Sequence, residues 1–247
     1  MIKTFKEIEI MQEGGKILSF ILQKVALQVK PGITTNYLND FAEKLIEEKK
    51  VIPSFKNYKG FPAALCTSLN EEIVHGLPSK RILKETDIIS LDLGICFQGY
   101  HTDMAITLPV SNKVDPEALR LIRIVRKTLK LSLKKIYPGN HLHEIGKFIE
   151  KYISSQGFAV IKELCGHGIG KQVHEDPCVL NFKESSSIIL KSGMVLCLEP
   201  MASLGRGEIR KSKYGYGFET IDNSLSAHFE ATVLVTDKSC KVLTKLL

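Results

Sequence analysis

The pattern that most restricts the fold is a pair of amphipathic helices that occurs twice in this chain of 247 residues. In each copy a long apolar repeat with helical spacing stops at a Pro-Gly pair, and a shorter helical repeat follows. A shift of 107 residues superimposes Pro31-Gly32 on Pro138-Gly139, Leu38 on Ile145, Phe41 on Phe148, Lys44 on Lys151 and Leu45 on Tyr152. We interpret the repeat as an internal duplication within one domain, residues 1–247, with pseudo-symmetric halves at about 1–110 and 111–247. Chance similarity between two amphipathic helix pairs is the alternative.

Segments rich in apolar and β-branched residues lie between and after these helices and predict strands at 88–96, 105–110, 194–201 and 231–235. Two helices followed by strands, twice along the chain, predict two similar halves packed about a pseudo-two-fold axis with their sheets joined. A cleft between the halves is the expected place for a site. The glycine-rich, charged segment 205–226 is expected to be an excursion between the last two strands, outside the core.

Composition limits the classes of protein that fit this chain. Hydrophobic residues make up 44% of it, enough for a sizeable core, yet no apolar stretch reaches the ~18 residues of a membrane span. Six scattered cysteines without a CxxC pair indicate reduced thiols in a reducing compartment such as the cytoplasm. The net charge of +7 allows basic faces at 120–135 and 206–213. Because no nucleic-acid-binding module accompanies them, an ordinary solvated lysine surface is the simpler interpretation.

Two aspartates belong together in this pattern because one of them interrupts an apolar strand. Asp92 lies within Ile88–Ile95, where a buried carboxylate needs a partner. Asp103 follows a turn region, and a hairpin centred between residues 97 and 98 would pair Asp92 directly with Asp103. Carboxylates placed side by side destabilise a fold unless they share a proton or hold a cation. The alternative is a turn aspartate next to an unrelated, hydrogen-bonded strand aspartate.

Two more acids occupy apolar strand positions, and one histidine lies between glycines. Glu199 is in the strand 194–201, and Glu230 is at the start of the strand that ends at residue 235. The glycines around His167 let the backbone pack closely and leave the imidazole accessible. Four carboxylates and one imidazole suit a pair of divalent ions such as Mn, Fe, Co or Zn, which bridging carboxylates hold ~3.5–4 Å apart. The chemistry that this set predicts is metal-assisted hydrolysis by an activated water.

Two further histidines, His75 and His174, fit the same chemistry. Neutral imidazoles beside a metal pair can hydrogen-bond a scissile carbonyl and stabilise the oxyanion that forms from it. A satisfied surface histidine explains either residue equally well on local sequence alone.

The sequence resembles the type 1 methionine aminopeptidases in its motifs HGLP, GHGIG, LEP and FEATVLVT, and in the order of Asp92, Asp103, His167, Glu199 and Glu230. The resemblance extends from the first helix to the C-terminus and fits the minimal bacterial form. It implies the pita-bread fold, an α+β architecture with a curved antiparallel sheet backed by two helix pairs about a pseudo-two-fold axis. It also implies a single catalytic domain that removes the initiator methionine from nascent proteins when the second residue is small.

In this family the ligand set holds two divalent metal ions, and the resemblance implies a role for each residue. Asp92 would chelate the first ion, and Asp103 and Glu230 would bridge both ions. His167 and Glu199 would complete the site of the second ion. Glu199 would also carry a proton from the bridging water to the leaving amine. The choice among Co, Fe, Mn and Zn does not follow from the sequence.

The resemblance also implies how the substrate is held. His75 would contact the scissile amide, and His174 would hold the substrate carbonyl. The methionine side chain would occupy a small apolar cup with His75 at its edge, formed by Tyr58, Phe61 and Cys66.

Three positions depart from the family pattern. Gly94 stands where a Thr is common, Val173 where a Phe is common, and Tyr216, in a late loop, where a Trp is common. The resemblance places Tyr216 among the substrate-binding residues. These departures leave the depth of the pocket, the tuning of the metals and the tolerance for the second residue open. The smaller Val173 predicts a looser cleft wall near the second residue of the substrate.

Three alternative functions fit fewer of these features. Prolidases and aminopeptidase P use the same five ligands on the same fold, but they carry a large N-terminal domain for which 247 residues leave no room. Relatives that lost the metals and became binding or ribosome-associated proteins lack the ligand set that is intact here. A nucleic-acid-binding module has only the charge of +7 in its favour.

The expected partners are therefore the N-termini of nascent polypeptides, with neither DNA nor a membrane. The chain is expected to act as a monomer in the cytoplasm. Contact of its basic patches with the ribosome surface stays open.

Overall fold

The structure is a computed structural model that describes residues 2–185, 188–213 and 215–245. The α-helices in these ranges form the two predicted pairs, α1 (Phe5–Ala26) with α2 (Thr35–Glu48), and α3 (Pro116–Ser132) with α4 (His143–Ser155). Two short 3₁₀ turns accompany them, η1 (Tyr58–Gly60) and η2 (Leu133–Lys135). No helix within the described ranges is long and apolar enough to cross a membrane.

The helix starts are fixed by side chains that accept hydrogen bonds from the free backbone N–H groups at these ends. Thr4 and Glu7 form a capping box at α1, in which each side chain accepts from the backbone N–H of the other residue. Thr34 caps α2, where its hydroxyl accepts from the backbone N–H of Tyr37. Asp115 caps α3 ahead of Pro116. Proline is favourable at this first helical position, because a backbone N–H there would have no partner within the helix.

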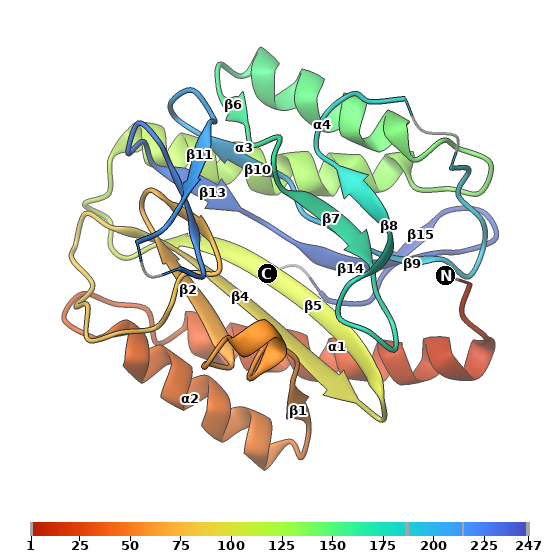
Figure 1. The fold of residues 1–247 in the computed structure, drawn as a ribbon, viewed down its shortest axis with the longest axis horizontal. Coiled ribbons are helices and arrows are strands. Elements are labelled where there is room, and N and C mark those ends of the chain that lie inside the picture. The colour runs from red at the N-terminus through yellow and green to blue at the C-terminus, as the bar shows by residue number, and fades with distance from the viewer. Residues whose placement is uncertain (1, 186–187, 214, 246–247) are drawn as a thin grey trace.

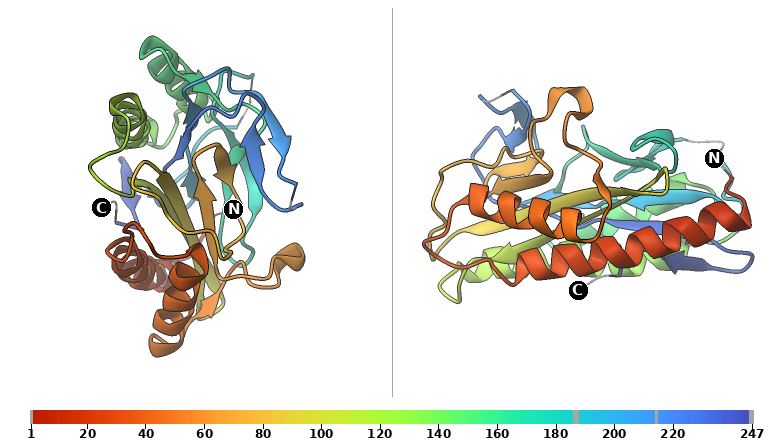
Figure 2. Two further views of the ribbon diagram at one scale, coloured as in Figure 1. Left: turned by 90° about the vertical axis from the view of Figure 1, so that its left-hand side faces the viewer. Right: turned by 90° about the horizontal axis from the view of Figure 1, so that it is seen from below.

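The helix pairs flank the strands: in Figure 1, α3 and α4 lie above the strands and α1 and α2 below them, and Figure 2 shows the same arrangement from two other sides. α1 packs on β4 (Ile88–Phe97) and β5 (Tyr100–Pro109), whereas α3 packs on β10 (Met201–Ser203) and β13 (Ser226–His228). One connected core joins the apolar faces of all four helices, through fully buried residues such as Leu22, Leu38, Leu129 and Ile149.

Most strands belong to two antiparallel sheets, one from each half of the chain. The first sheet has the order β1 (Ile52–Pro53), β4, β2 (Leu65–Leu69), with β5 paired to β4. The second has the order β15 (Cys240–Val242), β14 (Ala231–Val235), β9 (Val195–Leu198), β7 (Cys165–Gly168), β8 (Glu175–Leu180). Two smaller sheets consist of β13, β10 and β6 (Ala159–Val160), and of β11 (Ile209–Lys211), β12 (Phe218–Thr220) and β3 (Glu72–Val74).

Two of the predicted segments differ from the structure. The strand predicted at 194–201 is interrupted, because β9 ends before Glu199-Pro200 and β10 begins at Met201. A proline cannot donate to a strand ladder, which explains the break. The segment 205–226 is more than an excursion, since its hairpin β11–β12 pairs with β3. These strands are only three residues long and charged, so they lack the apolar alternation that predicts a strand.

The predicted direct pairing of Asp92 with Asp103 is wrong, because the hairpin is centred one residue later than predicted. Asp92 pairs with Ala105, and Gly94 pairs with Asp103. The hairpin turns through two residues, Gln98 and Gly99, which both have positive φ (49° and 83°), so its centre lies one residue later than predicted. The two aspartates still share a face of the sheet as diagonal neighbours, because side chains alternate with a period of two.

Two threonines join β5 to the last part of the chain where no regular ladder forms. The Thr107 hydroxyl donates to the His228 carbonyl and accepts from the His228 N–H, both at 2.8 Å. The Thr232 hydroxyl makes the same two contacts with the backbone of Asp103, also at 2.8 Å. Each hydroxyl therefore satisfies a buried backbone donor and acceptor at once; Thr232 joins β14 of the second sheet to β5, and Thr107 joins β5 to β13 of the small sheet.

Candidate functional site

A cavity of about 570 Å³ opens between the two halves of the strand layer. Every site residue predicted from the sequence lines it: Tyr58, Phe61, Cys66, His75, Asp92, Asp103, His167, His174, Glu199, Tyr216 and Glu230. The two sheets and the loops between them thus bring together side chains that are far apart in the sequence.

The four acids and His167 form one buried cluster at the bottom of the cavity. Carboxylate oxygens of Asp92, Asp103 and Glu230 all lie within 4.8 Å of one another. Nε2 of His167 lies 3.9 Å from Glu230 Oε1 and 3.6 Å from Glu199 Oε1. Glu230 therefore stands between the two aspartates on one side and the His167–Glu199 pair on the other.

Local backbone contacts hold these side chains in place. Asp92 and Asp103 extend from β4 and β5, His167 from β7, whereas Glu199 follows β9 and Glu230 precedes β14. The Glu230 N–H donates to the carbonyl of residue 105 at 2.8 Å, and the Asn181 side chain donates to the Glu199 carbonyl at 2.9 Å.

The glycines beside His167 are required by close backbone contacts. A Cβ at Gly166 would collide with the Cys197 carbonyl, and one at Gly168 would collide with the Asp176 carbonyl. Neighbouring strands can therefore approach β7 more closely than any side chain would permit, as the sequence predicted.

The electrostatics of the cluster indicate a cation site. Burial raises the pKa of all four acids, and their mutual charge adds to the effect at Asp92, Glu199 and Glu230; the pKa of Asp103 rises to about 7. Among the described residues, Asp92 Oδ1 and Glu230 Oε1 are buried without a hydrogen-bond partner. Buried, unpartnered carboxylate oxygens in one cluster with an imidazole match the donor set that divalent transition ions prefer.

Two histidines that line the cavity, His75 and His174, are suited to act as neutral hydrogen-bonding groups. His174 Nδ1 lies 3.0 Å from the Tyr58 hydroxyl, and the His174 ring is 4.4 Å from the ring of His167. Partial removal from water lowers the pKa of His75, and the Lys59 ammonium adds to this. The same removal from water, followed by the charges of His167 and His75, lowers the pKa of His174 to about 3.

The apolar cup lies beside this cluster. Phe61, Ala63 and Cys66 are buried together, with Phe55 packed against them. Tyr216 closes one side, because its ring meets Phe61 edge-on at 5.6 Å. The Tyr216 hydroxyl also donates to the carbonyl of residue 60 at 3.0 Å, which fixes the ring in this position.

The departure at Val173 does not have the position expected of it. Val173 is buried at 3% exposure and is not among the residues that line the cavity. A looser cleft wall therefore cannot arise from direct contact of a substrate with Val173. Tyr216 is the departure that faces the cavity.

Sequence reasoning missed two buried side chains beside the acids, His228 and Cys197. His228 lines the cavity, and its Nε2 lies 3.5 Å from Glu199 Oε2. Burial lowers the pKa of His228 to about 3, so the ring is neutral. The Cys197 thiol lies within 4.8 Å of donor atoms of His167 and Glu230. The only sequence signal for His228 was its place two residues before Glu230.

Gly94 has a structural reason to lack a side chain. A Cβ at this position would lie 2.9 Å from both Ser54 Cβ and Phe55 Cε1. We expect Gly94→Ala to destabilise the protein by about 1–3 kcal/mol through overpacking, which lowers the melting temperature by roughly 2–12 °C, and Gly94→Thr to lower it further. Thermal unfolding of both variants measures this. An unchanged melting temperature in both would show that residues 54 and 55 move aside freely.

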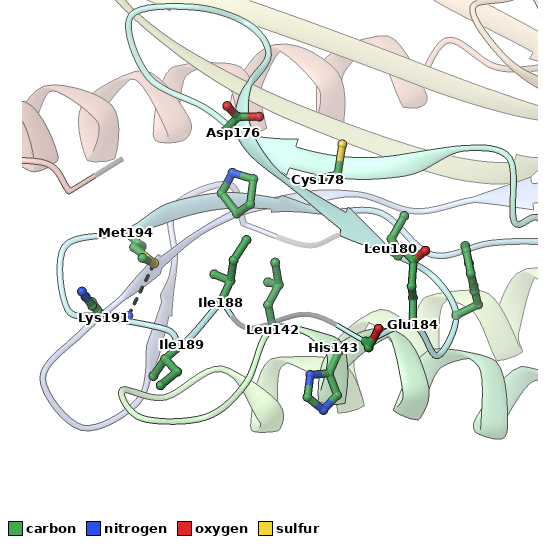
Figure 3. A pocket seen from close by; sticks show the side chains of 13 residues that line it. Leu142, His143, Asp176, Cys178, Leu180, Glu184, Ile188, Ile189, Lys191 and Met194 are labelled. Carbon is green, nitrogen blue, oxygen red and sulfur yellow. Dashed lines mark hydrogen bonds between the residues drawn. The ribbon is translucent and has the colours of Figure 1, made fainter.

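A second cavity, of about 940 Å³, lies away from the acids (Figure 3). It is bounded by β8, the start of α4 and the chain around residue 190, with a lining that includes Leu142, His143, Cys178, Leu180, Ile188 and Met194. None of the predicted site residues lines it. The cavity between the two sheets is thus the one that contains the predicted chemistry.

Fold and site together define a metallopeptidase, and residues 9–237 match the model of metallopeptidase family M24. The chain is 40% identical over 245 residues to a methionine aminopeptidase of Clostridium perfringens, covering 99% of this chain and 98% of the relative. A crystal structure of methionine aminopeptidase from Thermotoga maritima superposes with a TM-score of 0.97 at 38% identity, covering 100% of this chain and 99% of that one. The chain belongs to metallopeptidase family M24 and, within it, to the methionine aminopeptidases.

A prolidase from Pyrococcus furiosus shares the fold at a lower level of similarity. It superposes with a TM-score of 0.81 at 23% identity, covering 100% of this chain and 66% of the prolidase. At that identity the match shows the fold alone. These superpositions confirm the predicted α+β pita-bread architecture.

Proposed function

We propose that this chain is a methionyl aminopeptidase that removes the initiator methionine from nascent proteins when the second residue is small. One observation carries the proposal: the acid and histidine cluster and the apolar cup open into the same cavity. A substrate whose first side chain fills the cup would present its first peptide bond to the cluster.

Two divalent ions would be held by Asp92, Asp103, His167, Glu199 and Glu230. The position of Glu230 between the aspartates and His167 supports a bridging role, and Asp103 would share it. When bound, the ions supply Lewis acidity that polarises a carbonyl and makes water nucleophilic near neutral pH. Which of Co, Fe, Mn or Zn is used would depend on availability, because this donor set accepts several.

The remaining steps fall to side chains of the protein. His75 and His174 would hydrogen-bond the scissile amide and its carbonyl, and the Tyr58 hydroxyl supports this by orienting His174. Glu199 would move a proton from the attacking water to the leaving amine. Its place in the cavity, 3.6 Å from Nε2 of His167, supports this role, because a carboxylate beside the metal ligands can accept a proton from water and pass it on.

The cup formed by Phe61, Cys66 and Tyr58, closed by Tyr216, would select an unbranched first side chain. Discrimination by apolar shape is worth only about 1–3 kcal/mol, so norleucine should still be removed while Leu, Val and Lys are poor substrates. Methionine would be released when the second residue is Gly, Ala, Ser, Thr, Pro or Val.

Release of methionine from short peptides tests the proposal. The metal-free protein, reloaded with each metal in turn, is expected to cleave Met-Ala-Ser and to leave Met-Lys-Ser largely intact. Cleavage of Leu-Ala-Ser as fast as Met-Ala-Ser would exclude the methionine assignment.

Tyr216 offers a matched test of the departures from the family pattern. We expect Tyr216→Trp to narrow the range of second residues X in a Met-X-Ser series, because Tyr216 faces the cavity. Val173→Phe is a separate variant, since Val173 is buried and does not line the cavity: the larger side chain should lower stability and can act on the substrate only through its neighbour His174. Equal profiles for Tyr216→Trp and the unchanged protein would show that this ring does not shape specificity.

We further propose that the protein acts as a monomer in the cytoplasm, where nascent N-termini are its substrates. Its six cysteines are all free thiols, which supports a reducing compartment. Contact with the ribosome through basic patches would bring the cavity to emerging chains. The division into similar halves, about 1–110 and 111–247, is supported by the two helix pairs: α1 and α2 pack on strands of the first half, and α3 and α4 pack mainly on strands of the second.

A further inference from the structure

His228 is a buried side chain for which the proposed reaction provides no role. It is 1% exposed, and neither of its ring nitrogens has a hydrogen-bond partner among the described residues. Leaving a polar group buried and unpaired costs about 1–3 kcal/mol, so such groups need an explanation. The ring lines the cavity and stands next to the acid cluster.

The atoms nearest to the ring suggest what it does. Nε2 of His228 lies 3.5 Å from Oε2 of Glu199, and the other carboxylate oxygen of Glu199 lies 3.6 Å from Nε2 of His167. Glu199 is therefore bracketed by two imidazoles, one facing each oxygen. The 3.5 Å separation is longer than the usual N–H···O distance of about 2.9–3.0 Å, so a small rotation of the carboxylate would complete the bond.

Both backbones are fixed, so only the side chains can adjust. The Thr107 hydroxyl binds the N–H and the carbonyl of His228, both at 2.8 Å. The Asn181 side chain donates to the Glu199 carbonyl at 2.9 Å. A neutral imidazole carries one N–H, and Glu199 Oε2 is the acceptor that faces Nε2.

We propose that His228 is a positioning residue for Glu199, whose Oε2 accepts a hydrogen bond from Nε2–H of His228 while Oε1 stays turned toward His167. The inference rests on the proposed function, since it concerns how Glu199 is presented to a divalent ion. Removal of a group that hydrogen-bonds to a metal ligand typically weakens metal binding 10- to 100-fold.

Three substitutions separate the hydrogen bond from the shape of the ring. The amide nitrogen of His228→Gln can reach the position of Nε2, so this variant keeps a donor. The amide of His228→Asn is one bond too short, and His228→Leu has no donor. We expect the dissociation constant of Mn²⁺, measured calorimetrically on the metal-free proteins, to rise about 10-fold or more for Asn and Leu. The Gln variant should stay within about threefold of the unchanged protein.

Two further measurements separate an effect on metal binding from a loss of turnover or of folding. The visible spectrum of bound Co²⁺ should change for Asn and Leu and not for Gln, while thermal unfolding without metal identifies any variant that fails to fold. Unchanged Mn²⁺ affinity in Asn and Leu, or an equal loss in all three variants, would overturn the role of the N–H. Absence of divalent binding in the unsubstituted protein would instead contradict the proposed function itself.

Discussion

Asp103→Asn is expected to lower kcat/KM for Met-Ala-Ser by about a thousandfold or more, at the upper end of the loss from removing one group that stabilises the transition state. The reason is its proposed position between both ions, where its oxygens lie within 4.8 Å of those of Asp92 and Glu230. Metal content after dialysis should fall in parallel, because an amide is a weaker ligand than a carboxylate. Activity assays and metal analysis of the same preparations measure both.

A matched control is available on the same sheet. Asp87 is buried at 5% exposure just before β4 and binds Asn70 and the backbone of Lys84, outside the cavity. Asp87→Asn should lower stability and leave metal content unchanged. If Asp103→Asn retains more than about a tenth of the activity, the loss is far smaller than expected for such a group. The proposed role of Asp103 as a bridging ligand would then be wrong.

The metal-free protein is expected to become less stable as the pH rises from 6.5 to 8.5. A carboxyl whose pKa is raised by folding binds its proton more tightly in the folded state, so its stabilising contribution disappears as the pH rises through the folded pKa. That value is about 7 for Asp103, and the pKa values of Asp92, Glu199 and Glu230 are raised well above their usual range. Each proton held only by the folded state changes the unfolding free energy by about 1.4 kcal/mol per pH unit.

The histidines whose pKa values are lowered by folding act mainly below this window. As the pH rises above about 6.5, the ordinary histidine pKa, the unfolded chain also loses these protons, and the opposing effect of the histidines fades. Below that pH they act in the opposite direction, because the unfolded chain binds their protons more tightly. Maximum stability of the metal-free protein is therefore expected near pH 6.5.

Melting temperatures in EDTA should fall by about 5 °C or more across this window, since a chain of this size loses roughly 2–4 °C per kcal/mol. Saturating Mn²⁺ should remove or reverse the slope, because the ions displace protons from their ligands. The Asp103→Asn variant should show a shallower slope, as it lacks one of the titrating groups. A melting temperature in EDTA that is constant or rises with pH would contradict the buried acid cluster.

The helices were predictable because their signals are local. Thr34, Asp115 and the Pro-Gly pairs mark ends that involve only neighbouring residues. The register of β4 with β5 depended on the length of one turn, and the positive φ of Gln98 has no marker in the sequence. The face shared by Asp92 and Asp103 was nevertheless correct, because a shift of the turn centre by one residue moves the partner by two.

The site was predictable as a set of residue types and only in part as a set of contacts. Acids in apolar strands are unusual enough to be recognised one by one, as Glu199 and Glu230 were. His228 differs because its significance comes from Glu199, which lies on another strand segment and meets it only in the folded chain. The same limit applies to Val173, whose burial away from the cavity has no local sequence signal.

The hydrogen bond between the Asp103 N–H and the Thr232 hydroxyl joins residues 129 positions apart. This separation determines how much of the chain must be synthesised before the site can form. A ribosome delivers Asp92 and Asp103 long before Glu230 and Thr232 emerge. Until then a growing chain has three of its four acids, Asp92, Asp103 and Glu199, and lacks both Glu230 and the hydroxyl that anchors β5. The complete set of acids and the bond that anchors β5 can therefore form only after the last strands have been made, so a chain that ends before β14 is expected to be inactive.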